Sequence, residues 1–454
     1  MTVRLVAAVS AVAVGLLGSG QTARQKTELG LAVASFEDVW QTINDSYYDP
    51  AFGGVDWPAV RRELLPRAQA ALSAEDVRAV IREMIGRLGR SHFDLLSEST
   101  ALPGAATVPI EIRVQASEVV VTRVGRDTPA FRAGLRPGQV LLAIDGVAAD
   151  AWRPASAVTD PRARDQKTWE AAFRALHGDD RSKASLRVRD LDGREHAVGV
   201  ERDEGSGDVR TFGNIAVRRG TLDTTRVRTP GGREVGVIAF NMWMTDVSAA
   251  FDSAIDTFRS ADGLVIDLRG NPGGLVGMIF GIAGHLLAEP LVLGTMRTRT
   301  SPSLVFKANP RFSTADGRRV TPFAGRVAIL VDEQTASTSE IFTGALQSLG
   351  RARVMGRQTM GQAMPASTKT LPNGDVLLYV VGDFVTTTGR SLEGAGVVPD
   401  ETVPLSKAAL AAGRDAALEA ALAWIDRARL LLLCSDDLQD TRFLPRWVAP
   451  LMRP

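Results

Sequence analysis

The sequence contains very few residues that could form disulfides or bind metals. Its 454 residues include one cysteine, Cys434, which excludes an intrachain disulfide; because it follows an apolar run, we expect a buried, inert thiol. The four histidines, His92, His177, His196 and His285, show no metal-ligand spacing. No strand pattern leads into a Walker or Rossmann glycine signature. We therefore expect no metal and no organic cofactor.

An excess of charge of either sign is also lacking. Lys and Arg total 53 and Asp and Glu total 52, which gives a formal net charge of +1. This balance argues against nucleic acid or an anionic membrane as the main partner. The hydrophobic fraction of 45% is enough for ordinary folded cores. A chain of this length predicts two or three domains.

Long apolar runs are absent apart from one at the N-terminus. Arg4 precedes an apolar run from Leu5 to Leu17, and small residues follow it. The run is shorter than the roughly 20 residues that span a bilayer as a helix. The pattern predicts a signal peptide over residues 1–23, with cleavage near Gly20 or Ala23, and hence a periplasmic or secreted protein without a stable membrane span. A buried N-terminal helix is the alternative, and whether the leader is cleaved or retained as an anchor stays open.

Helical periodicity dominates residues 24–104. Apolar residues recur at helical spacing at Phe36, Val39, Trp40 and Ile43. A second helix is expected from Ser73 to Leu88, with Ser73 as its N-cap. The sequence therefore predicts a small helical domain, which ends in "LGRSHF" around His92.

The sequence pattern of residues 105–203 differs from that of the preceding domain and predicts short strands. The stretch from Thr128 to Gly146 reads as a short helix, a glycine stop, a Pro-Gly turn and a strand that ends in Asp-Gly. This stretch resembles the core of a bacterial-type PDZ domain. The resemblance implies a β module that can bind an extended peptide by strand addition. A structural module that binds nothing is the alternative, and His177 and His196 are expected on its surface.

Strands alternate with helices over residues 204–405, which predicts an α/β core with parallel strands. Buried strands are expected at 263–268 and 326–332, and helices at Leu275–Leu287 and Ser337–Leu349. Residues 204–208 are a candidate linker. Residues 406–454 form a C-terminal tail, predicted to be helical from Lys407 to Leu432 and to dock on the core.

Two segments of this core are suited to acyl-transfer chemistry. Ser337 is predicted at the start of a helix, where backbone N–H groups can stabilise an oxyanion. The same segment is an S-x-x-E capping box with Glu340, so local sequence leaves a nucleophile and a cap both open. Gly273 and Gly274 follow the first buried strand and could supply oxyanion donors together with the N–H of Thr338. An ordinary glycine-rich turn is the alternative.

Three segments occur in a characteristic order: "DLRGNPGG", "VDEQTASTSEIFTGALQSLGRARVMGRQTMG" and "TTTGRSLEGAGVVPD". Together with "LGRSHF" they resemble the C-terminal processing peptidase and tricorn-core family of serine peptidases. The resemblance implies a multi-domain α/β protein with an N-terminal helical domain, an inserted PDZ-like module and a crotonase/ClpP-like peptidase core. It also implies that Ser337 is the nucleophile.

That family has two branches with different general bases. One uses a Ser–Lys dyad, with the lysine in a G-K-G motif downstream of the serine. Here the corresponding position is Gln362, which cannot act as a base, and the role of Gln362 stays open. The nearest downstream lysine, Lys369, lacks the motif.

The tricorn-like branch uses a tetrad, and this sequence has a candidate for each member. The resemblance implies that His92 is the base for Ser337 and that Ser91 and Glu393 orient the imidazole. Taken alone, His92 would be a histidine at a helix C-terminus and Glu393 a solvated loop charge. His285 is expected to be a packing residue.

The sequence therefore predicts an exported serine endopeptidase that cleaves protein or peptide substrates through a Ser337 acyl-enzyme. Three alternatives stay open: an inactive binding protein on the same fold, an adaptor that works through its PDZ-like module, and a crotonase-type acyl-CoA enzyme. The natural substrate, the effect of the PDZ-like module on activity, and any homo-oligomeric state are not determined by the sequence.

Overall fold

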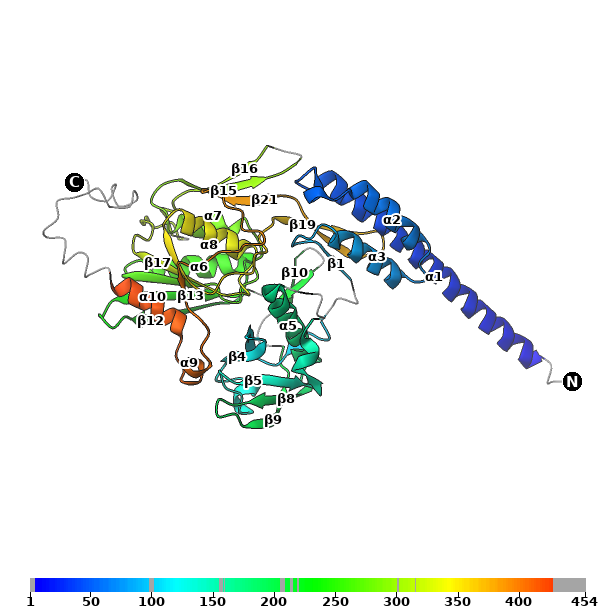
Figure 1. The fold of residues 1–454 in the computed structure, drawn as a ribbon, viewed down its shortest axis with the longest axis horizontal. Helices are drawn as coiled ribbons and strands as arrows, with labels where there is room; N and C mark the ends of the chain where they lie inside the picture. Colours follow the sequence, from blue (N-terminus) through cyan, green and yellow to red (C-terminus); the bar gives the residue numbers. More distant parts are fainter. Residues whose placement is uncertain are drawn as a thin grey trace.

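The computed structural model describes residues 5–97, 102–154, 158, 160–204, 209–212, 215–218, 220–299, 302–314 and 316–427. Cys434 and the last part of the predicted tail lie outside these residues. Figure 1 shows three parts: blue N-terminal helices, a cyan and teal β module, and a green to orange α/β core.

The N-terminal part contains helices α1 (Leu5–Ser46), α2 (Trp57–Gln69) and α3 (Ala74–Gly86), with a short 3-10 turn η1 (Phe52–Gly54) between the first two. Phe36, Val39 and Ile43 are fully buried between the helices, which confirms the predicted apolar face. The Ser73 side chain accepts the N–H of Asp76 and so caps α3, as expected. Within the described residues, no helix combines the length and apolarity needed to cross a membrane.

A hairpin from the C-terminal half of the chain completes this helical part. Strands β19 (Ala366–Thr370) and β20 (Val376–Val380) form a sheet with β1 (Asp94–Leu96) in the order β1-β20-β19. Leu377 and Val380 are buried in the same apolar cluster as α1 to α3. An ion pair between Lys369 Nζ and Asp38 Oδ1 (2.6 Å) joins the hairpin to α1. The position of His92, just before β1, is therefore fixed by residues far away in the sequence.

The β module is built around the sheet β3-β4-β5-β8-β9, with β6 paired to β5. Its strands are β3 (Ile110–Gln115), β4 (Glu118–Val124), β5 (Val140–Ile144), β6 (Val147–Ala148), β8 (Lys183–Arg189) and β9 (Glu195–Glu201). Helices α4 (Pro129–Arg132) and α5 (Pro161–Leu176), the turn η3 (Ala149–Trp152) and the pair β2 (Ala106–Thr107) and β7 (His177–Gly178) complete it. The expectation that His177 lies on the surface was wrong. It is buried, with Nδ1 2.8 Å from the carbonyl oxygen of Phe173, because it directly follows the packed end of α5.

The α/β core has a six-stranded sheet in the order β12-β13-β14-β17-β18-β22. Its strands are β12 (Leu222–Arg228), β13 (Glu234–Phe240), β14 (Gly263–Asp267), β17 (Arg326–Val331), β18 (Ala352–Gly356) and β22 (Glu401–Thr402). Only β12 is antiparallel to its neighbour, so the predicted parallel pairing is confirmed. Helices α6 (Thr245–Phe258), α7 (Met278–Gly284) and α8 (Thr338–Ser348) pack in one apolar cluster with this sheet. The helix expected over Leu275–Leu287 is thus limited to α7.

Smaller elements flank the core. Strands β15 (Leu291–Arg297), β16 (Leu304–Ala308) and β21 (Asp383–Thr386) form a sheet in the order β16-β15-β21. Strands β10 (Val209–Phe212) and β11 (Ile215–Arg218) form a hairpin in the region that joins the β module to the core.

The helical character predicted for the tail from Lys407 onward is confirmed in the described residues, but the helix is interrupted. The tail contains two helices, α9 (Lys407–Ala411) and α10 (Ala416–Asp426), and residues 428–432 lie outside the described part. The helix is interrupted at Gly413, whose φ of +70° lies in the left-handed region. Asp415 then caps the second helix. Helix α10 packs against the core sheet in a second apolar cluster, so the expected docking is confirmed.

Candidate active site

Ser337 lies at the turn between strand β17 and helix α8. Its backbone has φ 54° and ψ −121°, a conformation that costs a non-glycine residue about 1–3 kcal/mol. Neighbouring loops hold the turn in place: the Ser337 N–H donates to the carbonyl of Gln362 (2.7 Å), and the Ala336 N–H donates to the carbonyl of Asn271 (3.1 Å). The strained turn is therefore supported by two loops that are distant in the sequence.

A continuous chain of hydrogen-bonding distances runs from Ser337 to Glu393. Ser337 Oγ lies 3.1 Å from Nε2 of His92, and Nδ1 of His92 lies 2.8 Å from Ser91 Oγ. Ser91 Oγ donates to Oε2 of Glu393 (2.8 Å), and the Ser91 N–H donates to Oε1 (2.9 Å). The four side chains that the sequence singled out are thus brought together, from three different segments of the chain.

This chain of contacts also fixes the tautomer of His92. A hydroxyl has one proton to donate, and Ser91 gives that proton to Glu393. Ser91 Oγ must therefore accept the Nδ1–H of His92, which leaves Nε2 unprotonated in the neutral imidazole. The unprotonated nitrogen is the one that faces Ser337 Oγ, as a general base requires.

Burial keeps His92 neutral. Its imidazole is held between the helical part and the core, and removal from water lowers the pKa of His92 from 6.5 to about 4. The ring is therefore unprotonated at neutral pH and able to accept a proton from Ser337.

The glycine-rich loop after β14 packs directly against the nucleophile. A Cβ on Gly273 would lie 2.6 Å from Ser337 Cβ, so only glycine fits there. The Gly273 N–H donates to Oδ1 of Asn271 (3.0 Å) and is thus already used. By contrast, the N–H groups of Gly274 and Thr338 donate no hydrogen bond to any described residue. The Thr338 hydroxyl donates to the carbonyl of Gly274 (2.8 Å) and so joins this loop to the start of α8.

Glu340 is a fully buried carboxyl group beneath the nucleophile turn. It accepts the N–H groups of Ser337 (3.2 Å), Gly361 (2.7 Å) and Gln362 (2.9 Å), and also the Thr359 hydroxyl. Burial raises the pKa of Glu340 to about 7, although these hydrogen bonds act to lower it. Glu340 therefore acts as the carboxyl of a capping box, while the hydroxyl of Ser337 in the same turn faces His92.

Other candidate residues lie away from this constellation. The side-chain amide of Gln362 lies 3.5 Å from Oε1 of Gln166 in α5, and Lys369 is paired with Asp38. His285 is buried with Nε2 2.8 Å from Oδ1 of Asp252, as expected for a packing residue. Within the described segments, no group of three His, Cys, Asp or Glu side chains could hold a metal ion.

Sequence reasoning gave no role to Asn271, which is fully buried. Its Nδ2 donates to the carbonyl of Phe240 (2.9 Å), and its Oδ1 accepts the Gly273 N–H. The residue thereby fixes the glycine loop to the end of β13. The only available signal was its place inside "DLRGNPGG". This signal is weak, because a polar residue between glycines usually indicates an exposed turn.

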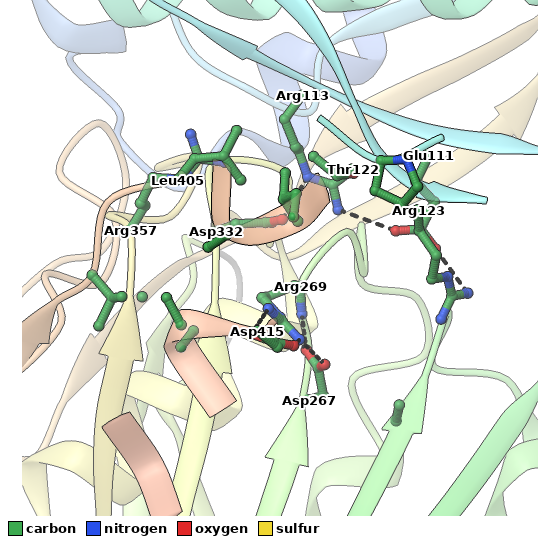
Figure 2. Close-up of a pocket in the computed structure, with 18 of the residues that line it drawn as sticks. Glu111, Arg113, Thr122, Arg123, Asp267, Arg269, Asp332, Arg357, Leu405 and Asp415 are labelled. Carbon is green, nitrogen blue, oxygen red and sulfur yellow. Dashed lines mark hydrogen bonds and ion pairs between the residues drawn. The ribbon is translucent and has the colours of Figure 1, made fainter. Parts of the chain in front are cut away.

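A cavity of about 440 Å³ lies where the β module, the core and the tail meet, and none of the four side chains of the Ser337–Glu393 chain lines it (Figure 2). Arg113 of β3 reaches across to Asp332, with Nε and Oδ2 2.5 Å apart, and Asp332 accepts the N–H of Gly270 (2.9 Å). Arg269 pairs with both Asp267 (2.6 Å) and Asp415 of the tail (2.7 Å). These ion pairs attach the β module and the tail to the loops that carry the glycines and Ser337.

Comparisons with known proteins found two matching family profiles and several similar proteases. Residues 234–403 match the profile of "Peptidase family S41", and residues 34–86 match that of the "Tricorn protease C1 domain". The chain is 28% identical over 396 residues to a carboxyl-terminal-processing protease of Synechocystis sp., covering 84% of each protein. It is 26% identical over 382 residues to the carboxyl-terminal-processing protease of a Picosynechococcus species, covering 80% of this chain and 81% of that one.

Solved structures share the fold. The photosystem II D1 C-terminal processing protease aligns with a TM-score of 0.55 and 21% identity, over 85% of this chain and 98% of that chain. Mature CPAF aligns with a TM-score of 0.64 and 14% identity, over 91% of this chain and 99% of that chain. The chain therefore contains a peptidase family S41 domain and a Tricorn protease C1 domain, is similar to carboxyl-terminal-processing proteases, and is a serine-type peptidase.

Proposed function

We propose that this protein is an exported serine endopeptidase in which Ser337 forms the acyl-enzyme and His92 is the general base. One observation carries the proposal: the unbroken chain from Ser337 Oγ through His92 and Ser91 to Glu393, with each step at 2.8 to 3.1 Å. Nucleophile, base and orienting groups at such distances are the arrangement that activates a serine.

In the first half-reaction, Ser337 Oγ attacks the carbonyl carbon of the scissile peptide bond, and its proton passes to Nε2 of His92. The imidazolium that forms keeps its Nδ1–H on Ser91, which is itself oriented by Glu393. The backbone N–H groups of Gly274 and Thr338 donate to the oxyanion of the tetrahedral intermediate. Gly273 contributes by having no side chain, since a Cβ there would collide with Ser337.

Collapse of the intermediate breaks the C–N bond, and Nε2–H of His92 protonates the leaving amine. An ester then links Ser337 Oγ to the acyl part of the substrate. Water attacks this ester with His92 again as base, which releases the new carboxyl group and restores the serine hydroxyl. Besides the substrate and water, these steps use side chains and backbone groups of this chain.

We also propose roles for the remaining parts. Residues 105–203 act as a PDZ-like module for protein or peptide substrates, and residues 204–405 as a crotonase/ClpP-like core. The N-terminal segment 1–23 directs export to the periplasm or beyond. The pattern of Arg4, a short apolar run and small residues supports export.

Labelling with a fluorophosphonate probe tests the catalytic proposal. Wild type, Ser337→Ala and His92→Ala are compared, with far-UV circular dichroism to establish that each variant is folded. We expect wild type to be labelled and both variants to lose labelling, because the probe reports an activated serine.

Two other outcomes contradict parts of the proposal. Loss of labelling in Ser337→Ala alone would mean that another group is the base. No labelling of wild type, together with no cleavage of a peptide library, would favour a binding protein on a peptidase fold.

A further inference from the structure

Trp243 lies in the connection between β13 and α6 and forms a backbone bridge with the glycine loop of the active site. Its N–H donates to the carbonyl of Gly273 (2.9 Å), and its carbonyl accepts the N–H of Leu275 (2.8 Å). These two bonds pair Trp243 with Gly274 as a parallel bridge, but they do not use the N–H of Gly274 itself. The main chain of Trp243 therefore holds Gly274 in place, while the Gly274 N–H stays available as an oxyanion donor.

The approach between Trp243 and Gly274 is close. A Cβ on Gly274 would lie 2.4 Å from the carbonyl oxygen of Trp243 and 3.2 Å from its Cβ. Gly274 also has a φ of +138°, a conformation that residues with a side chain rarely adopt. A displacement of the Trp243 main chain is therefore transmitted directly to Gly274.

The indole of Trp243 is anchored beside the other oxyanion donor. Its Nε1–H donates to Ser339 Oγ (2.8 Å), and both side chains are fully buried, so water cannot replace either partner. Ser339 directly follows Thr338 at the start of α8. The rings of Phe240 and Phe342 pack against the indole, with centroids 5.0 and 5.1 Å away. The side chain of Trp243 therefore fixes the start of α8, and its main chain fixes the glycine loop.

We propose that Trp243 is a positioning residue that sets the separation of the two oxyanion donors, the N–H groups of Gly274 and Thr338. The inference rests on the proposed function of Ser337 and deepens it. Donors act best when they lie about 2.7–3.1 Å from the oxyanion, so a small displacement weakens both. A second connection exists, because the Thr338 hydroxyl donates to the carbonyl of Gly274 (2.8 Å). Loss of the indole contact therefore displaces the donors without detaching the loop from α8.

The test compares wild type with Trp243→Phe, Ser339→Ala and the double variant. Trp243→Phe retains an aromatic ring but lacks the N–H donor, and Ser339→Ala removes a single oxygen atom from the other partner. Trp57→Phe is the matched control, since Trp57 is fully buried in the helical part and its Nε1–H donates to the carbonyl of Trp40 (3.3 Å).

Three kinds of measurement are made on each protein. The first is kcat and KM for a short chromogenic peptide, chosen from the digest of a peptide library. The second is the inhibition constant of the aldehyde of the same peptide. Ser337 Oγ adds to the aldehyde carbon and its proton passes to His92, which leaves a tetrahedral adduct whose oxyanion occupies the site between the two donors. The third is the melting temperature.

For each single variant we expect kcat to fall by about 10-fold and the inhibition constant of the aldehyde to rise by a similar factor, less than for loss of a complete donor. KM stays within about twofold of wild type, because the donors act mainly in the transition state. Trp57→Phe keeps the wild-type kcat and aldehyde affinity, whatever its melting temperature.

The double variant separates positioning from stability. Its kcat should match that of the single variants, because both substitutions remove the same contact. Its melting temperature should be higher than that of Ser339→Ala, since no buried polar group is then left unpaired. Should Trp243→Phe not fold, the kcat and aldehyde affinity of Ser339→Ala decide the question.

Wild-type kcat and aldehyde affinity in the folded single variants would overturn the inference and make the indole contact purely structural. Additive losses of kcat in the double variant, or an equal loss in Trp57→Phe, would overturn it as well. These results would leave the proposed function intact, because wild type would still react through Ser337. Failure of wild type to cleave the peptide and to be labelled by a fluorophosphonate would overturn the proposed function, and this inference with it.

Discussion

Ser337 donates its backbone N–H to the backbone carbonyl of Gln362 across 2.7 Å, so the two residues meet through the main chain. The Gln362 side chain lies instead near Gln166 of the β module. The position where a related branch has its lysine therefore supports the nucleophile turn without contributing a base.

The first prediction follows from that contact. Gln362→Ala keeps the backbone carbonyl, so we expect its labelling rate to stay within about twofold of wild type, as for substitutions away from key contacts. Fluorophosphonate labelling kinetics at pH 7.5 measure this. A loss of more than an order of magnitude would assign a catalytic role to the amide.

Ser91 is predicted to act only as a relay between His92 and Glu393. Ser91→Ala removes the acceptor for Nδ1–H and so loosens the tautomer and orientation of the imidazole. We expect kcat/KM to fall on the order of 100-fold, less than for loss of His92 itself. In a double-mutant cycle with Glu393→Gln, the two losses should be strongly less than additive, since both act through the same ring. Additive losses would show that the two residues act separately.

The glycine loop offers a matched pair of substitutions. Gly273→Ala places a Cβ 2.6 Å from Ser337 Cβ and 2.9 Å from the Thr338 nitrogen, so the nucleophile or the oxyanion donor must shift. We expect kcat to fall by about 100-fold or more, comparable to loss of an oxyanion donor. Gly277→Ala is the control, because nothing lies within 4 Å of its added Cβ. Steady-state kinetics should show near wild-type activity for Gly277→Ala, and equal losses in the two variants would contradict the steric argument.

The lowered pKa of His92 predicts activity in mild acid. A base with a pKa of about 4 remains unprotonated well below the ordinary histidine value of 6.5. The labelling rate of wild type at pH 5.5 should therefore be similar to that at pH 7.5 when the probe itself is stable. An acid limb centred near pH 6.5 would show that the imidazole is better hydrated than its environment implies.

The raised pKa of Glu340 predicts that the stability of the protein falls as pH rises. Its pKa is raised in the folded state from 4.5 to about 7, so its stabilising contribution is complete below pH 4.5 and is lost as pH rises through 7. Relative to Glu340→Gln, the free energy of unfolding of wild type should fall by on the order of 2–3 kcal/mol over that window. Urea denaturation of both proteins at pH 5, 6 and 7.5 measures the difference. A constant difference would show that Glu340 titrates normally.

Local sequence was sufficient for much of the fold. The helical spacing of Phe36, Val39 and Ile43 and the Ser73 cap correctly predicted the N-terminal helices, because both signals depend on residues within a few positions of one another. The buried parallel strands β14 and β17 were predicted for the same reason. The break at Gly413 was missed, although the sequence carries both a glycine there and the capping residue Asp415 two positions later.

The sequence by itself determined which residue types were available: an "SH" pair, a serine at a helix start, two glycines and a late glutamate, in the order that resembles a peptidase family. Local sequence alone left both a capping serine and a nucleophilic serine open for Ser337. Only the tertiary structure decided that Ser337 faces His92 and that Glu393 reaches His92 through Ser91. The physical reason is that these contacts connect residues hundreds of positions apart, and their distances depend on the packing of whole domains.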